Sequence, residues 1–367
     1  MTTILGIEST AHTFGVAIVR DGKILANVRK AYTTEKGGIV PMDAAKHHNQ
    51  KKEEAYSEAL EKAGIREEDI DAIAISQGPG LAPCLLEGMK FAKELSSRLK
   101  KPIVPVNHCV AHLEIGRITG AKDPVMLYAS GANTQIIAYA SGKFRVFGET
   151  LDIGIGNFID NFARYAGIGF PGGPKVEKLA AKGKNFVEIP YKVKGMDIAL
   201  SGILTNLKQK LEKIQGKSLS RPPNPKSNKE YESVLLLTDK KSRVSASKNK
   251  KNSVDYTLED LAFSLQETVF AMLVEVSERA LAHTGKKELL LGGGVGCNSR
   301  LQEMCRIMCK ERGARFFCPE IQFLVDNAGM IAFLGEIMFK SGIKEKAENM
   351  DIKPRQRTDD VEVSWRK

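Results

Sequence analysis

The sequence predicts an α/β protein built from two copies of one β-β-β-α-β-α-β unit. Each copy opens with three segments whose apolar patterns are typical of strands. The first three are TILGIE, TFGVAIVR and KILANVRKAY, and the second three are PVMLYA, TQIIAYA and KFRVFGET. A two-residue hairpin signal joins the last two strands of each set, Asp21-Gly22 in one and Ser141-Gly142 in the other. The two signals lie 120 residues apart (142 minus 22).

The second halves of the two units also match. DAIAIS leads into GPGLAPCLLEG and then PIVPV, and KELLLGG leads into GVGCNSRLQEM and then RFFCP. In each case a buried-looking strand ends at glycines that open a helix, and another strand follows. Because 367 residues exceed one ordinary core, we expect two lobes with a cleft between them. We place the lobes at residues 1–122 and 123–342, followed by a C-terminal tail at 343–367.

One long amphipathic helix is expected from Thr257 to His283. Thr257 and Asp260 form a capping-type start. Apolar residues recur at helical spacing at Leu258, Leu261, Leu265, Val269, Met272 and Val276. We assign these side chains to the core. The histidine pair in AAKHHNQ, His47 and His48, lies on a polar helix face and is expected to face solvent.

The composition is that of an ordinary globular protein, with 42% hydrophobic and 27% charged residues. No apolar run is long enough to span a membrane, and MTTILGIEST lacks the basic and apolar regions of a leader peptide. The six cysteines form no C-x-x-C pair, which favours small core residues in a reducing compartment. We therefore expect a cytoplasmic protein with no membrane partner.

The net charge of +11 invites a nucleic-acid interpretation, but the charge is unevenly distributed. Residues 216–253 hold ten Lys and Arg against three Asp and Glu, which is +7 of the total. Because this segment combines low hydrophobicity with high charge, we expect a solvated basic insertion. VLLL at 234–237 could form a short strand within it. An arm that touches RNA or a partner is the alternative.

The stretch NHCVAHLEIGR places His108 and His112 four residues apart at the start of a predicted helix. Both imidazoles should therefore lie on one face, a spacing that suits a metal ion. A third ligand is needed, and Asp326 in FLVDNAGMIA is the plausible oxygen donor. Tyr128, at the end of a strand, could add a phenolate. The alternative is a partly buried, hydrogen-bonded histidine pair without a metal.

Glycine-rich turns at 78–80 and 292–296 end predicted strands and open helices. Such turns expose backbone amide groups that bind phosphate well, although glycines also serve tight turns and close packing. A third cluster, FPGGPKVE, places Gly172 and Gly173 before Glu177. The pattern favours a phosphate site with a ribose-binding carboxylate nearby.

Nine stretches spread over nearly the whole chain outside the insertion carry a family resemblance. They are GIESTAHTFGVAIV, PIVPVNHCVAHLEIGR, LYASGANTQIIAY, GETLDIGIGNFIDNFARYAG, PGGPKVEKLA, KGMDIALSGI, FSLQETVFAMLVEVSERA, GGGVGCNSRLQEM and VDNAGMIA. Together they resemble the universal tRNA threonylcarbamoyl transferase family, in the version that forms the catalytic subunit of the archaeal and eukaryotic KEOPS complex. The tail RQRTDDVEVSW is similar too.

The resemblance implies the actin-like ATPase fold of sugar kinases, heat-shock proteins and actin, with family-specific helices at 151–205. It implies transfer of threonylcarbamoyl from its adenylate to the exocyclic amine of the adenosine 3′ to the anticodon. One divalent ion, iron or zinc, would be held by His108, His112, Tyr128 and Asp326. The ATP or AMP moiety would be bound by Ser130, Gly131, Ala132, Asp160, Gly173, Glu177 and Asn298. Catalytic groups beyond the metal ligands stay unassigned.

The resemblance also implies partners: tRNA, a small protein kinase, a dimerising subunit and a tRNA-binding subunit. The chain departs from the family pattern at two places. It has Ala132 where the family usually has a second glycine, and Ala328-Gly329 where the family usually has Gly-Ala. A methyl group at either place could crowd the nucleotide or shift Asp326 and thereby reduce or alter activity.

Three rival functions have to be weighed against the transferase. In the zinc-peptidase motif H-E-x-x-H a general base follows the first histidine, and here Cys109 occupies that position, which argues against a metalloprotease. A small-molecule kinase would use the same phosphate site, but a histidine pair beside the phosphates is foreign to its chemistry. The third rival is an ATP-binding scaffold for a partner kinase.

Overall fold

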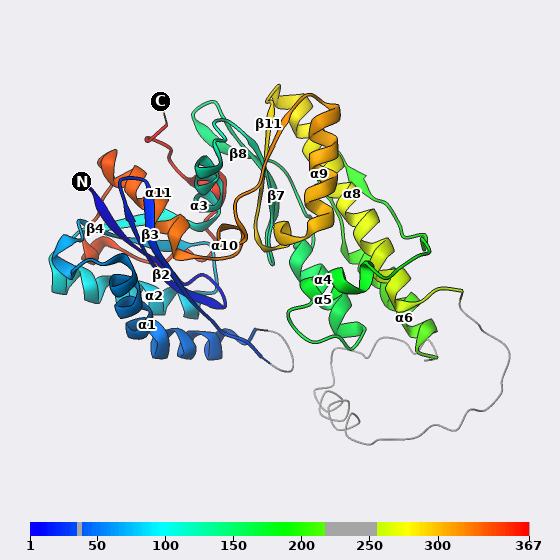
Figure 1. Ribbon diagram of the computed structural model, residues 1–367, viewed down its shortest axis with the longest axis horizontal. Helices are drawn as coiled ribbons and strands as arrows, with labels where there is room; N and C mark the ends of the chain where they lie inside the picture. The colour runs from blue at the N-terminus through cyan, green and yellow to red at the C-terminus, as the bar shows by residue number, and fades with distance from the viewer. Residues whose placement is uncertain (35–38, 217–254, 367) are drawn as a thin grey trace, which may run out of the picture.

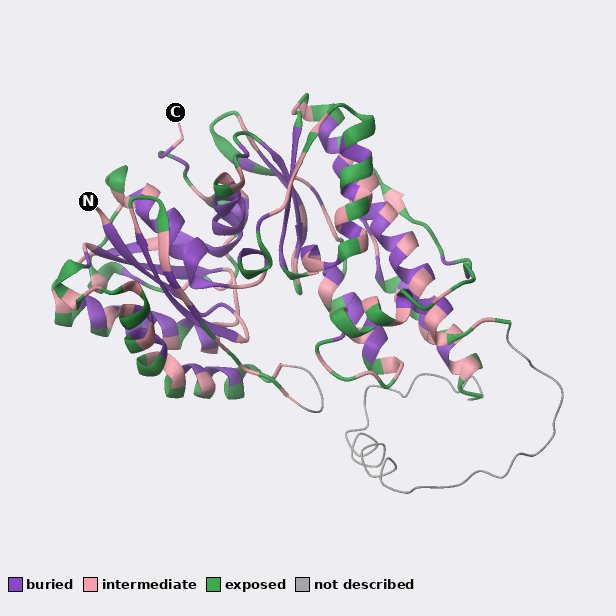
Figure 2. Ribbon diagram, in the orientation of Figure 1, coloured by how far each residue is buried: buried purple, intermediate pink, exposed green. Residues whose placement is uncertain are grey.

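The computed structural model describes residues 1–34, 39–216 and 255–366, and in these ranges helices and sheets alternate in five layers (Figure 1). The strands of both sheets and the helix faces turned toward them consist largely of buried residues (Figure 2). No helix in the described ranges is long and apolar enough to cross a membrane. The basic insertion predicted at 216–253, including its short strand at 234–237, lies beyond Gly216 outside the described residues.

The first sheet has the strand order β3-β2-β1-β4-β5. Its strands are β1 (Thr3–Glu8), β2 (Thr13–Arg20), β3 (Lys23–Ala31), β4 (Ala72–Gly78) and β5 (Ile103–Asn107). The three strands β1 to β3 are antiparallel, whereas β4 and β5 run parallel to β1. Two helices, α1 (Pro41–Ala63) and α2 (Ala82–Leu99), cover its outer face.

The second sheet has the order β12-β11-β6-β7-β8, which is the order of the first sheet read from the opposite edge. Its strands are β6 (Val125–Ala129), β7 (Thr134–Ala140), β8 (Lys143–Glu149), β11 (Glu288–Gly292) and β12 (Arg315–Phe317). Between β8 and β11 lie α4 (Ile155–Tyr165), α5 (Gly173–Ala180), β9 (Val193–Lys194), β10 (Asp197–Ile198), α6 (Ser201–Ile214) and α8 (Leu258–Thr284). Helix α9 (Ser299–Glu311) follows β11.

Both predicted hairpin turns are confirmed. Asp21 and Gly22 have φ values of 48° and 78°, and Ser141 and Gly142 have values of 51° and 78°. Two successive residues with positive φ define the tight turn whose twist matches that of the flanking strands. Glycine at the second position adopts this conformation without a steric penalty.

The middle layer contains two short helices that pack between the sheets. They are α3 (His108–Glu114) and α11 (Ala328–Lys340). Although α11 comes near the end of the chain, it packs on the first sheet, against β1, β2 and β4. The second sheet contributes to both neighbouring layers, because side chains alternate along its strands: Met126 and Tyr128 point into the middle layer, and Leu127 points to the outer one.

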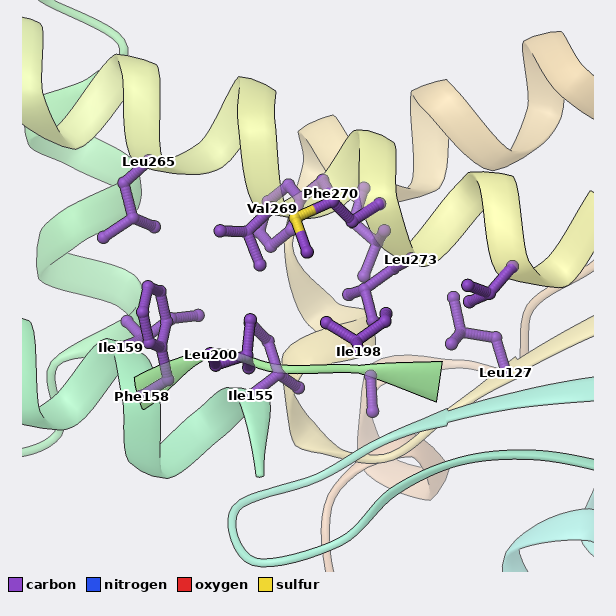
Figure 3. Packing of buried hydrophobic residues seen from close by; sticks show 14 of the residues in the cluster. Leu127, Ile155, Phe158, Ile159, Ile198, Leu200, Leu265, Val269, Phe270 and Leu273 are labelled. Carbon is purple, nitrogen blue, oxygen red and sulfur yellow. The ribbon is translucent and has the colours of Figure 1, made fainter. Parts of the chain in front are cut away.

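The outer face of the second sheet is covered by α4, α5, α6, α8 and α9. Figure 3 shows Leu265, Val269 and Leu273 of α8 facing Ile159 and Ile198. The long helix predicted at 257–283 is confirmed as α8. Its predicted start is also confirmed, because the Thr257 hydroxyl accepts the Asp260 amide and the Asp260 carboxylate accepts the Thr257 amide.

The expectation that the histidine pair of α1 faces solvent is wrong for one member. His48 is fully buried, and its Nε2 lies 3.1 Å from the Ala11 carbonyl oxygen. Its ring contacts Phe14 on β2. Burial lowers the pKa of His48 to about 4, so the ring is neutral at pH 7. The polar neighbours of His48 in the sequence concealed that α1 turns this position toward the sheet.

Close packing of α11 on β1 depends on Gly6. A Cβ atom at this position would lie 2.6 Å from the Ala332 nitrogen and 2.7 Å from the Ala328 carbonyl oxygen. We expect Gly6→Ala to lower the free energy of unfolding by about 1–3 kcal/mol, the usual cost of overpacking. Gly202→Ala is the control, because no described atom lies within 4 Å of its added Cβ. Urea unfolding measures both, and equal stability of the two variants would contradict the predicted contact.

Candidate metal centre and neighbouring glycine turns

The two predicted histidine ligands are placed by the junction between β5 and α3. Asn107 ends β5 and caps α3, because its Oδ1 accepts the Val110 amide at 3.0 Å. The helix therefore begins at His108, and one turn later His112 lies on the same face. The two ring centroids are 4.8 Å apart. Both side chains are buried.

The third predicted ligand arrives from the other end of the chain. Asp326 precedes α11, whose cap is Asn327, and its Oδ1 lies 3.4 Å from His108 Nε2 and 3.6 Å from His112 Nε2. Two ligand atoms bound at about 2.1 Å to one tetrahedral ion would be about 3.4 Å apart. The ligand atoms of His108, His112 and Asp326 all lie within 4.8 Å of one another. These residues therefore form a possible metal-binding site.

The hydrogen bonding of His112 also fits a ligand. Its ring is 1% exposed, yet neither ring nitrogen has a hydrogen-bond partner among the described residues. A buried imidazole without partners is costly, and a cation in front of it would remove that cost. The predicted alternative, a hydrogen-bonded histidine pair, does not describe this ring.

A fourth residue, Glu8, completes the centre, and sequence reasoning missed it. Glu8 ends β1 and is fully buried, and its Oε2 lies 3.0 Å from His108 Nδ1. Its other oxygen accepts the Thr10 amide at 2.7 Å and the Thr10 hydroxyl. A carboxylate behind a histidine fixes which ring nitrogen faces a metal. The signal was available: a glutamate ends the otherwise apolar strand TILGIE.

Electrostatics in the centre are governed by the carboxylates of Glu8 and Asp326. Burial alone would lower the pKa of His108, but the charges of Glu8 and Asp326 outweigh it and raise that pKa well above its usual value. Burial would raise the pKa of Asp326, and contacts with His108 and His112 hold it well below its usual range. For His112 burial dominates and lowers the pKa. Buried Glu8 and partly exposed Asp326 thus create a site that favours a cation.

Tyr128, the fourth predicted ligand, lies beside the centre. It is 1% exposed, and its ring centroid is 5.1 Å from that of His112. Burial raises the pKa of the Tyr128 phenol well above its usual value, so it would ionise only beside a cation. Its role as a ligand stays a prediction.

The turn at 130–132 and the loop after β11 meet next to Tyr128, whereas the predicted turn at 78–80 packs elsewhere, because the Gly80 amide donates to the Pro354 carbonyl at 3.1 Å. The turn Ser130–Ala132 follows β6, and its carbonyl groups accept the Gly156 amide at 3.0 Å and the Asn157 amide at 2.9 Å from α4. A Cβ at Gly293 would lie 2.4 Å from the Ala129 carbonyl oxygen, so the loop after β11 touches the same place. Gly131 and Ala132 are exposed.

Asp160 and Gly173 lie on neighbouring helices. The Asp160 Oδ1 accepts the Gly172 amide at 2.7 Å, which fixes the loop before α5. Burial raises the pKa of the Asp160 carboxyl, and this hydrogen bond opposes the shift. A Cβ at Gly172 would lie 2.6 Å from that of Ala163, whereas no described atom lies within 4 Å of one at Gly173. Gly173 therefore borders open space.

Glu177 and Asn298 meet at the start of α9. Glu177 Oε1 accepts the Ser299 amide at 2.8 Å and its hydroxyl at 2.6 Å. Asn298 caps α9 through the amides of Arg300 and Leu301, and its Nδ2 donates to Gln266 Oε1 at 2.6 Å. Glu177 and Asn298, both predicted to bind the nucleotide, are thus already hydrogen-bonded within the protein.

This geometry defines a class: a mixed α/β protein in which two buried histidines and a partly exposed aspartate meet between two sheets. Residues 23–333 match the family model of tRNA N6-adenosine threonylcarbamoyltransferase (TsaD). The chain belongs to this family, which confirms the resemblance drawn from the sequence motifs and supports the transferase over its rivals.

The tRNA N6-adenosine threonylcarbamoyltransferase of Thermococcus kodakarensis is 50% identical over 98% of this chain and 99% of its own length. A probable bifunctional tRNA threonylcarbamoyladenosine biosynthesis protein of Methanosarcina mazei is 46% identical over 99% of this chain and 60% of its own length. Among solved structures, Thermococcus kodakarensis HypF matches 95% of this chain with a TM-score of 0.54 and 14% identity. The chain spans 49% of that structure, and this likeness concerns the fold alone.

Replacing Glu8 tests the centre without removing a ligand. We expect Glu8→Gln to lower zinc affinity about 10- to 100-fold, the usual loss when the partner of a metal-bound histidine is changed. The matched control is Glu288→Gln, which alters a buried carboxylate that accepts the Lys122 and Asp123 amides. Calorimetric zinc titration of chelator-treated protein measures both. Unchanged affinity in Glu8→Gln would contradict the assignment of Glu8.

Proposed function

We propose that this chain transfers a threonylcarbamoyl group from threonylcarbamoyl-AMP to the exocyclic amine of the adenosine 3′ to the anticodon in tRNA. Family membership supports the reaction class, because relatives that match over nearly the whole chain are named for this transfer. The His-His-Asp group beside the glycine turns, with both histidines buried, is the observation that carries the proposal to particular residues.

The metal would be a divalent ion, iron or zinc, held by His108, His112 and Asp326 with Tyr128 alongside. Both metals accept imidazole and carboxylate ligands. When bound, the ion would act as a Lewis acid toward the carbamoyl oxygen. The substrate is already activated as an acyl-adenylate, so no general base is needed beside His108 to deprotonate water. Cys109, which occupies the position of that base, is buried. This agrees with a reaction that needs no general base there.

The residues around the metal would hold the centre in one geometry. Glu8 orients the His108 ring and keeps its Nε2 toward Asp326. The caps Asn107 and Asn327 fix the helix starts that carry the ligands. Because these groups are set before substrate arrives, little reorganisation is required during the transfer.

The adenylate would lie over the exposed turn Ser130–Ala132 and the open side of Gly173. Backbone amides at the glycine turns would hold the AMP phosphate. Asp160 and Glu177 would then offer carboxylates to the ribose, with Asn298 nearby. Glu177 already binds the start of α9, so it would contribute its second oxygen. Asn298 would act mainly by shaping the turn that it caps.

The two departures from the family pattern differ in their exposure to solvent. Ala132 is exposed and does not have a positive φ, so its methyl group strains nothing in the protein and can affect only what binds there. Ala328 is fully buried, and a Cβ at Gly15 would lie 3.2 Å from its methyl group. That methyl packs on β2 while Asp326 keeps its place near the two histidines. Both departures are compatible with activity.

The finer fold assignment is part of the same proposal. We assign the two sheets with their helices to duplicated actin-like lobes, with the adenylate between them. The equal strand orders and the likeness to HypF support this. The lobe bounds 1–122 and 123–342 and the family-specific region 151–205 stay predictions. Helix α11 of the second segment packs on the first sheet, and α3 of the first segment contacts β6 and β11 of the second sheet.

We further propose tRNA and KEOPS-type subunits as partners: a small protein kinase, a dimerising subunit and a tRNA-binding subunit, in the cytoplasm. The bifunctional relative from Methanosarcina mazei supports an assembly, since it contains more than the part that matches this chain. The target adenine would have to leave its stack for its amine to reach the buried centre.

Loss of one metal ligand tests the function. We expect His108→Ala to lower formation of threonylcarbamoyladenosine about 10²- to 10³-fold or more, as when a main electrostatic stabiliser is removed. The matched control His283→Ala changes an exposed histidine at the end of α8 and should keep full activity. Mass spectrometry of tRNA nucleosides measures the product, with the proposed subunits, ATP, threonine, bicarbonate and the adenylate-forming enzyme present. Normal product from His108→Ala would refute the proposal.

Adjacent glycines test the adenylate position. We expect Gly173→Val to lower AMP affinity about tenfold or more, since its side chain would enter the open space, while stability changes by no more than about 0.5 kcal/mol. Gly172→Ala should instead lower stability, because its Cβ would meet Ala163. Calorimetry with AMP and urea unfolding separate the two effects. Full AMP affinity in Gly173→Val would contradict the proposed position.

A further inference from the structure

Residues 343–366 form a connecting segment that crosses from the first sheet to the second. Its start pairs with β5, because Ile103 and Glu345 exchange backbone hydrogen bonds of 2.9 and 2.7 Å. It then follows the end of β4, where the Lys353 amide donates to the Gln77 carbonyl at 2.8 Å. Later its short helix η6 (Thr358–Asp360) packs against β8. The segment therefore touches both sheets.

The segment also contacts both ends of α3, the helix that carries the histidines. At the first end, the cap residue Asn107 donates through Nδ2 to Gln356 Oε1 at 3.1 Å. At the other end, Glu114 accepts from Trp365 Nε1 at 3.2 Å and from Arg366 Nε at 2.7 Å. In Figure 1 the last part of the segment, drawn in red, passes beside α3.

The contact at Glu114 is buried and carries charge. The Glu114 side chain is fully buried, and its Oε2 forms an ion pair with Arg117 Nε at 2.5 Å. The Arg366 side chain is only 8% exposed, and its guanidinium lies 5.1 Å from the Tyr139 ring centroid and 5.2 Å from that of Phe144. A buried carboxylate held by two guanidinium groups resists displacement, because moving it would leave charges unpaired.

Helix α3 needs such support. It has seven residues, too few for a stable helix on its own. Glu114 is six residues after His108 and two after His112, so it is separated from them around the helix by about 120° and about 160°. The segment therefore fixes the face opposite the metal ligands. Rotation or sliding of α3 would change the 3.4 and 3.6 Å distances between the histidines and Asp326.

We propose that Trp365 and Arg366 are positioning residues for the metal centre, acting through Glu114 to fix α3. This inference rests on the proposed function of His108, His112 and Asp326 as metal ligands. Neither positioning residue touches the ligands. Their effect is on the place and orientation of the helix that presents both imidazoles.

The test uses full-length protein and two measurements that do not depend on catalysis. Arg366→Ala should lower zinc affinity about 10- to 100-fold and should speed amide hydrogen exchange across residues 108–114 in the metal-free protein. Arg366→Lys, which keeps a cation, should restore part of the affinity. The matched control is Arg315→Ala, which removes the arginine that contacts the buried carboxylate of Glu288 elsewhere in the chain. This control should keep wild-type zinc affinity.

His108→Ala separates the two proposals. If it binds zinc like the wild type, the proposed metal site is wrong. If it loses zinc while Arg366→Ala keeps wild-type affinity and exchange, only the positioning role is overturned. Should Arg366→Ala fail to fold, Arg366→Lys and Trp365→Phe carry the test. Weaker zinc binding in either then supports the role, and wild-type affinity in both overturns it.

Discussion

Two carboxylates that flank a buried histidine, one fully buried and one partly exposed, impose the constraint on which the rest of this structure depends. Glu8 and Asp326 face the same imidazole, that of His108; the Glu8 side chain is fully buried and that of Asp326 is 20% exposed. Charges in such a place must be compensated, by a proton on His108 or by a metal ion. The first sheet supplies Glu8, the junction of β5 and α3 supplies the histidines, and the start of α11 supplies Asp326. The fold brings these places together.

The chemistry lies at the carboxyl ends of parallel strands. Glu8 ends β1, Asn107 ends β5 before the first histidine, and β6 and β11 end at the glycine turns. Carboxyl ends of parallel strands meet at one edge of a sheet, and open α/β sheets bind their ligands there. The metal centre and the proposed adenylate site are neighbours because Tyr128 and Ser130 are two residues apart on the same strand end.

The middle layer joins the two halves mechanically. Helix α11 from the end of the chain packs on the first sheet, and α3 from the first half contacts β6 and β11 of the second. The connecting segment 343–366 adds a third link. A change in the relation of the two sheets would therefore move α3 and the start of α11, which carry the proposed metal ligands.

Sequence alone determined the elements whose signals are local: both hairpins, the capped helix α8 and the spacing of His108 and His112. The family motifs further indicated Asp326, which is 218 residues from His108 (326 minus 108). Only the tertiary structure decided the role of Glu8, the burial of His48 and the contact of Trp365 with Glu114. These depend on which groups face one another across 37 to 251 residues of chain (48 minus 11 for His48 and Ala11, 365 minus 114 for Trp365 and Glu114). Pairing across such separations leaves no periodic pattern in a single sequence.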